Sequence, residues 1–120
     1  LQALAEAAFA GLPEEFRELT GGVLFMVQDM PERETISGLG LKNGYELLGL
    51  FHGSPLSVHE ANRAGPLPTM IFLYRLPILD YWRRGGGELA DIVRHVLIHE
   101  IGHHFGLSDD DMHAIEAEAD

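Results

Sequence analysis

The residues best suited to chemistry form a short stretch near the C-terminus. His99 and His103 are four residues apart, and Glu100 directly follows the first of them. Because an α-helix turns once in ~3.6 residues, the two imidazoles project from one helical face and can bind one metal ion. Glu100 lies about 100° round the helix from His99, close enough to take a proton from a metal-activated water without binding the metal. The pattern predicts a zinc site with its own general base.

A third metal ligand has to come from beyond this helix. A catalytic zinc usually has three protein ligands and leaves a fourth position to water. Gly106 can adopt the left-handed conformation that ends a helix, and Asp109 can then direct its carboxylate back at the ion. Asp110 and Asp111 are alternatives to Asp109 in this role. Ser108 and Asp111 also have the spacing of a capping box, which predicts the start of a following helix.

Two further histidines flank the motif. His95 precedes His99 by one helical turn, and His104 lies about 100° round the helix from His103. Both are expected to pack, or to support the ligands, rather than to bind the metal. The side chains outside the motif that could stabilise an oxyanion are Tyr45, Tyr74, Tyr81, His52, His59 and His113. No spacing singles out one of them.

The stretch HEIGHHFGLSDDDM, which begins at His99, resembles the active-site segment of the small bacterial zincin-like metallopeptidase family with the HExxHxxGxxD signature. The resemblance extends to LPEEFRELTGGVLFMVQDMP, ELLGLFHGSPL and LPTMIFLYRLPIL, and so covers nearly the whole chain. It implies a compact zincin-like fold. It also implies one zinc bound by His99, His103 and Asp109, with Glu100 as catalytic acid and base, and a peptide or protein substrate whose sequence is not specified.

Length and composition predict one small domain over residues 1–120. With 46% hydrophobic residues, the chain can bury a single core. No apolar run reaches the ~18 to 20 residues that span a bilayer, and the opening LQALAEAAFAG lacks the basic region of a signal peptide. We therefore expect no membrane partner and a cytoplasmic location.

Charge and cysteine content narrow the partners and ligands. The net charge is −11 and only eight residues are Lys or Arg, which argues against a nucleic-acid partner, because phosphate backbones are bound by clustered basic residues. The absence of cysteine excludes thiolate ligands, so the metal must be held by nitrogen and oxygen. Six of the nineteen acidic residues lie within residues 109–120, where they are expected to form a solvated surface. The oligomeric state is not predicted.

Hydrophobic periodicity and turn residues predict an α+β fold. For such a fold, the resemblance to the zincin-like family implies a small mixed sheet packed on a long active-site helix with flanking helices. The long helix is expected at about residues 88–105, and other helices are expected at 1–10, 13–19, 77–84 and 109–120. Strands are expected at 23–27, 45–51 and 69–74. Residues 29–44 are expected to be rich in turns, and residues 52–68 to form a loop able to line a cleft. A zincin substrate would lie extended along an edge strand, either 45–51 or 69–74.

Two functions are compatible with this sequence. The first is a zinc-dependent peptidase that hydrolyses peptide bonds with a zinc-activated water and Glu100 as general acid and base. The second is a metal-bearing binding or regulatory module with latent or no hydrolytic activity. The intact Glu100 favours the peptidase.

Overall fold

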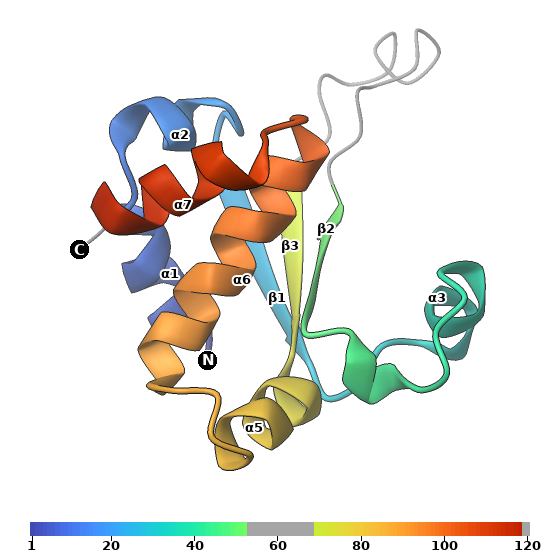
Figure 1. Cartoon of the computed structure of the whole chain (residues 1–120). Helices are drawn as coiled ribbons and strands as arrows, with labels where there is room; N and C mark the ends of the chain where they lie inside the picture. The colour runs from blue at the N-terminus through green and yellow to red at the C-terminus, as the bar shows by residue number, and fades with distance from the viewer. Residues whose placement is uncertain (53–68, 119–120) are drawn as a thin grey trace, which may run out of the picture.

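The computed structural model describes residues 1–52 and 69–118 (Figure 1). Its sheet contains β1 (Val23–Gln28), β2 (Gly49–His52) and β3 (Thr69–Tyr74) in the spatial order β1-β3-β2. β1 and β3 are parallel, whereas β2 and β3 are antiparallel. The sheet is therefore mixed, as predicted, and β3 is its central strand.

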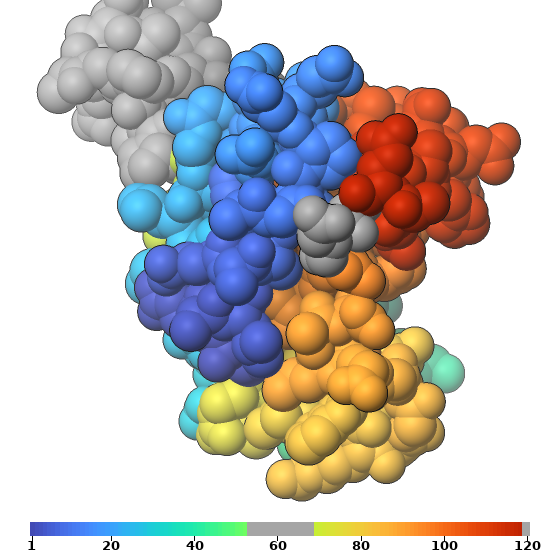
Figure 2. Space-filling model, turned by 90° about the vertical axis from the view of Figure 1, so that its left-hand side faces the viewer, coloured from blue at the N-terminus to red at the C-terminus, as the bar shows by residue number. Residues whose placement is uncertain are grey.

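The helices lie mainly on one side of this sheet. The helices on that side are α1 (Gln2–Ala10), α2 (Glu14–Glu18), α6 (Leu89–His104) and α7 (Asp109–Glu118). Figure 2 views the molecule from this side, where α1, α2, α6 and α7 form one continuous surface. Helix α6 contacts α1, β2 and α7, so the predicted long helix packed on a small sheet is confirmed. None of the helices in the described ranges is long and apolar enough to cross a membrane.

The hydrophobic core lies between α6 and the sheet. Phe25 of β1 and Ile71 and Leu73 of β3 are buried on the side that faces the helices. The buried aliphatic residues of α6 are Ile92, Val93, Val96, Leu97, Ile98 and Ile101. Each such side chain contributes about 1.5–3 kcal/mol on burial, which holds α6 firmly against the sheet.

β2 approaches α6 closely because Gly49 has no side chain. A Cβ atom at Gly49 would lie 2.6 Å from Cγ1 of Val96 and 3.1 Å from the backbone oxygen of Phe72. Gly49 therefore lets the strand lie directly against the helix that carries the motif.

Some boundaries differ from the sequence-based expectations. Helix α3 (Arg33–Gly38) lies within residues 29–44, which were predicted to be rich in turns. None of its residues is buried, so the sequence carries no amphipathic signal for it. The strand predicted at 45–51 is also shorter, because residues Gly44–Glu46 form a 3₁₀ turn closed by a capping box between Asn43 and Glu46.

The helix predicted at 77–84 begins earlier and is α5 (Arg75–Arg83). Pro77 is compatible with this start because the first helical turn needs no backbone donor. His52 was predicted to be the first residue of the loop 52–68, but it is the last residue of β2. The remaining residues, 53–68, lie outside the described residues.

Candidate metal centre

The motif lies at the C-terminal end of α6, where the chain reverses into α7. Gly106 has a φ of +75°, and the N–H of the next residue, Leu107, donates to the carbonyl of Gly102 at 2.8 Å. The hydroxyl of Ser108 then accepts from the N–H of Asp111 at 3.1 Å, and the Asp111 carboxylate accepts from the N–H of Ser108 at 3.3 Å. The predicted left-handed helix end and the predicted capping box are both confirmed.

The two helices meet at Gly102. A Cβ atom there would overlap Sδ of Met112 and would lie 2.8 Å from its Cγ. Met112 is fully buried, so its side chain has little space into which it can move. Gly102 therefore sets how closely α7 lies to the histidines of α6.

Gly102→Ala is expected to lower the free energy of unfolding by about 1–3 kcal/mol, because the added methyl group overpacks the contact with Met112. Urea unfolding followed by circular dichroism measures the change. Gly38→Ala is the matched control, since Gly38 is also helical but a Cβ atom there would meet no neighbouring atom within 4 Å. We expect the control to be neutral or slightly stabilising. Equal stabilities of the two variants would contradict a tight contact at Gly102.

His99 and His103 lie on successive turns of α6, as predicted. Their ring centroids are 5.7 Å apart, and the His103 side chain is exposed whereas that of His99 is only 20% exposed. Burial lowers the pKa of His99, and His95 lowers it further, while Glu116 opposes the shift. A lowered pKa keeps the imidazole neutral, which is the form that binds a metal.

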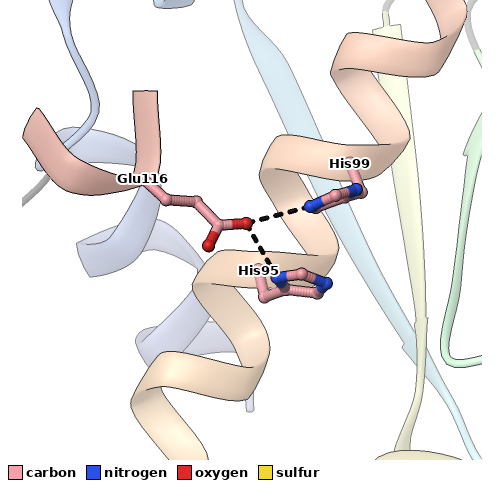
Figure 3. A group of neighbouring side chains, drawn as sticks. All are labelled: His95, His99 and Glu116. Atoms are coloured by element: carbon pink, nitrogen blue, oxygen red, sulfur yellow. Dashed lines mark hydrogen bonds and ion pairs between the residues drawn. The ribbon is translucent and has the colours of Figure 1, made fainter. Parts of the chain in front are cut away.

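Glu116 of α7 joins His95 and His99 in one cluster (Figure 3). Its Oε1 lies 2.7 Å from Nδ1 of His95 and 2.9 Å from Nε2 of His99. In the part of the chain that the structure describes, these three residues form the group of potential ligands whose donor atoms lie within 4.8 Å of one another. The nitrogen and carboxylate donors of this cluster are ligand types that zinc accepts.

The structure does not bring Asp109 into that cluster. Asp109 is exposed at the first position of α7, and Asp111, one of its alternatives, is engaged in the capping box. From the sequence, Glu116 was expected only to belong to the solvated acidic surface of residues 109–120. A local signal existed for His95, whose spacing from His99 repeats that of the motif, but none existed for Glu116, because its partners lie on another helix.

Glu100 is a half-buried residue of α6 and lies near the backbone of Phe51 in β2. Burial raises the pKa of its carboxyl group, and this effect exceeds the lowering by the backbone N–H of Phe51 and by His103. A carboxylate with a raised pKa is a better proton acceptor near neutral pH than an exposed glutamate. The residue expected to be the general base therefore has an environment suited to proton transfer.

The remaining aromatic side chains surround this centre. His104 stacks on Phe51 with ring centroids 4.1 Å apart, in agreement with the expected packing role. Of the side chains considered for oxyanion stabilisation, His113 has its ring centroid 6.4 Å from that of His99, and Tyr74 is buried. His59 lies outside the described residues.

A long helix that carries two histidines and an intervening carboxylate, packed on a small mixed sheet, has the organisation of a zincin. The chain belongs to the zincin-like metallopeptidase family, whose model matches residues 20–119. The matched region includes β1, β2, β3, α6 and α7, and with them the motif, Asp109 and Glu116. Membership supports a peptidase function that depends on a metal, typically zinc. A comparison with curated proteins gave no match.

Proposed function

We propose that this chain is a zinc-dependent peptidase in which His99, His103 and Asp109 hold one zinc ion and Glu100 is the general acid and base. The observation that carries the proposal is the half-buried Glu100, whose pKa is raised, next to two histidines on one face of α6. Nitrogen and carboxylate donors suit zinc, and no thiolate is needed. When bound, zinc supplies a Lewis acid that makes water a nucleophile near neutral pH.

Glu100 accounts for the proton transfers. Its carboxylate accepts a proton from the attacking water, and the resulting carboxylic acid donates that proton to the nitrogen of the leaving amine. The backbone N–H of Phe51 lies near this carboxylate and favours its ionised form, which opposes part of the effect of burial. The half-buried position limits the access of bulk water, which would otherwise weaken these interactions.

β2 is the strand best placed to bind an extended peptide. β3 pairs with a neighbour on each side, so its backbone groups are already engaged. β2 is an edge of the described sheet and contacts α6, and its Phe51 lies beside Glu100 and His104. A peptide added to this edge would pass next to the general base. The structure thus favours residues 49–52 over 69–74 as the substrate-binding strand.

One observation favours the second candidate, a metal-bearing binding module with little or no turnover. Nε2 of His99 is engaged by Glu116, while Asp109 is exposed and outside the cluster. A metal held in that arrangement would not use the ligand set of the proposed peptidase.

Metal removal tests the proposed function. We expect the purified protein to contain one zinc per chain and to cleave members of a mixed peptide library. Cleavage should be lost after treatment with a chelator and return when zinc is added, but not when magnesium is added, because magnesium prefers six oxygen ligands. Bound zinc without cleavage would favour the binding module. Failure to bind zinc after supplementation would contradict both candidates.

A further inference from the structure

We propose that His95, His99 and Glu116 form a second site for a zinc-class divalent cation, and that this site cannot be filled together with the motif site because both need His99. Binding of metal at the second site is independent of the peptidase proposal. The mutual exclusion rests on that proposal, since it assumes zinc at His99, His103 and Asp109.

The three donor atoms need only a small rearrangement to hold an ion. Ligand atoms around a tetrahedral zinc, with bonds of about 2.0–2.1 Å, lie roughly 3.3 Å apart. The contacts of Glu116 with His95 and His99 are 2.7 Å and 2.9 Å, so each must lengthen by about half an ångström. Small rotations of the side chains provide this change, because all three project from the facing surfaces of α6 and α7 (Figure 3).

The contacts also fix which atoms would bind. Both imidazoles contact the same oxygen, Oε1 of Glu116, and a carboxylate accepts hydrogen bonds. In the metal-free state Nδ1 of His95 and Nε2 of His99 therefore donate to Glu116. To bind a cation there, each imidazole would take the tautomer that carries its proton on the other ring nitrogen, so that the ion would be held by two neutral imidazoles and one carboxylate. Two histidines and one glutamate are a donor set found in zinc sites that keep a position open.

An ion can reach this cluster from solvent. His95 and Glu116 line a surface pocket of about 530 Å³, whose wall also includes Leu48 and Tyr81. The His95 side chain is 56% exposed and that of Glu116 is 28% exposed. The net charge of −11 favours the approach of cations. Filling the cluster therefore requires no opening of the hydrophobic core.

His99 is the residue that the two sites share. His95, His99 and His103 follow one another at intervals of four along α6, with ring centroids 3.9 Å apart for the first pair and 5.7 Å for the second. A neutral imidazole has one unprotonated nitrogen with a free lone pair, so His99 can bind one ion at a time. Glu100 and His103 are three residues apart on α6 and so are neighbours on its surface, which places Glu100 on the motif side. An ion held by His95 and Glu116 would leave the general base without its metal.

The experiment uses a background in which the motif site is removed, His103→Ala with Asp109→Asn. Both residues are exposed, so the fold should be retained. We expect this variant to bind one zinc or one cobalt ion per chain. Adding His95→Ala or Glu116→Gln should weaken binding at least tenfold, since even loss of an outer partner of a ligand costs about 10- to 100-fold. Glu118→Gln, an exposed change on the same helix, should leave the affinity unchanged.

The readout is metal stoichiometry and cobalt absorption, neither of which requires hydrolysis. A background variant that keeps the wild-type circular dichroism spectrum but binds no metal would overturn the second site, as would unchanged affinity after His95→Ala and Glu116→Gln. The wild type should bind one ion, and two ions would overturn the mutual exclusion. If the wild type cleaves peptides but the background variant binds no metal, the second site is wrong and the peptidase proposal stands. If the background variant binds metal but the wild type cleaves no peptide, the second site stands and the peptidase proposal does not.

Discussion

Glu100→Gln is expected to reduce kcat/KM for peptide hydrolysis by about 10²- to 10⁴-fold, the usual contribution of a general acid and base. Glutamine has nearly the same shape as glutamate, but it cannot take a proton from water. Zinc content should not change, because Glu100 is not a proposed ligand. The measurement is cleavage of the best library peptide by matched, zinc-loaded samples.

Glu88→Gln is the matched control for this substitution. Glu88 is exposed at the opposite end of α6 and makes no capping hydrogen bond, so its loss should leave hydrolysis unchanged. Undiminished cleavage by Glu100→Gln would remove Glu100 from the mechanism. Loss of zinc together with activity would instead show that Glu100 supports the metal.

The pH dependence of kcat/KM should also show that Glu100 is the general base. Only the ionised carboxylate accepts a proton, so wild-type kcat/KM should fall as the pH decreases through the pKa of Glu100. Because burial raises this pKa, the acid limb should lie above the ordinary glutamate value of 4.5. The residual activity of Glu100→Gln should lack that limb. A limb at or below the ordinary value would assign it to another group.

Glu100→Gln should also raise the free energy of unfolding at neutral pH, by about 0.5–2 kcal/mol, the common range for stabilising substitutions. A raised pKa means that the folded state binds this proton more tightly than the unfolded state, so wild-type stability falls as the pH rises between the two pKa values. Glutamine carries no charge and avoids this loss. The advantage of the variant should therefore disappear as the pH falls below 4.5, the ordinary value. Chemical unfolding at several pH values measures it.

Asp109→Asn is expected to weaken zinc binding at the motif by at least about 100-fold, since loss of a ligand should exceed the 10- to 100-fold cost of losing an outer partner. A neutral amide oxygen is a much poorer zinc ligand than a carboxylate. The comparison is made in a Glu116→Gln background, in which the second cluster should hold the ion at least about tenfold less tightly. Competition with a chromophoric chelator gives the affinities.

Asp110→Asn is the matched control for Asp109. Both residues are exposed in the first turn of α7, so both changes remove the same favourable interaction with the helix dipole. Equal zinc affinities would exclude Asp109 from the ligand set. A larger loss with Asp110→Asn would transfer the role to Asp110, which the sequence left as an alternative.

Local spacing in the sequence was sufficient to predict the helix that carries the motif. Its apolar residues predicted burial, and Gly106, Ser108 and Asp111 predicted its end and the start of α7. These features depend on residues within about one or two helical turns of one another, so the sequence contains the relevant information directly. The strand Thr69–Tyr74 was predicted with the same bounds for the same reason.

Only the tertiary structure decided which strand is central and which groups meet at the metal centre. Pairing of β3 with both β1 and β2 joins segments far apart in the sequence, and no local pattern distinguishes an edge strand from a central one here. Likewise, Glu116 reaches His99 because Gly102 lets α7 lie close to α6. The sequence determined the chemistry that this chain carries, whereas the packing of α7 determined which carboxylate lies beside the histidines, because that contact depends on the approach of two separate helices.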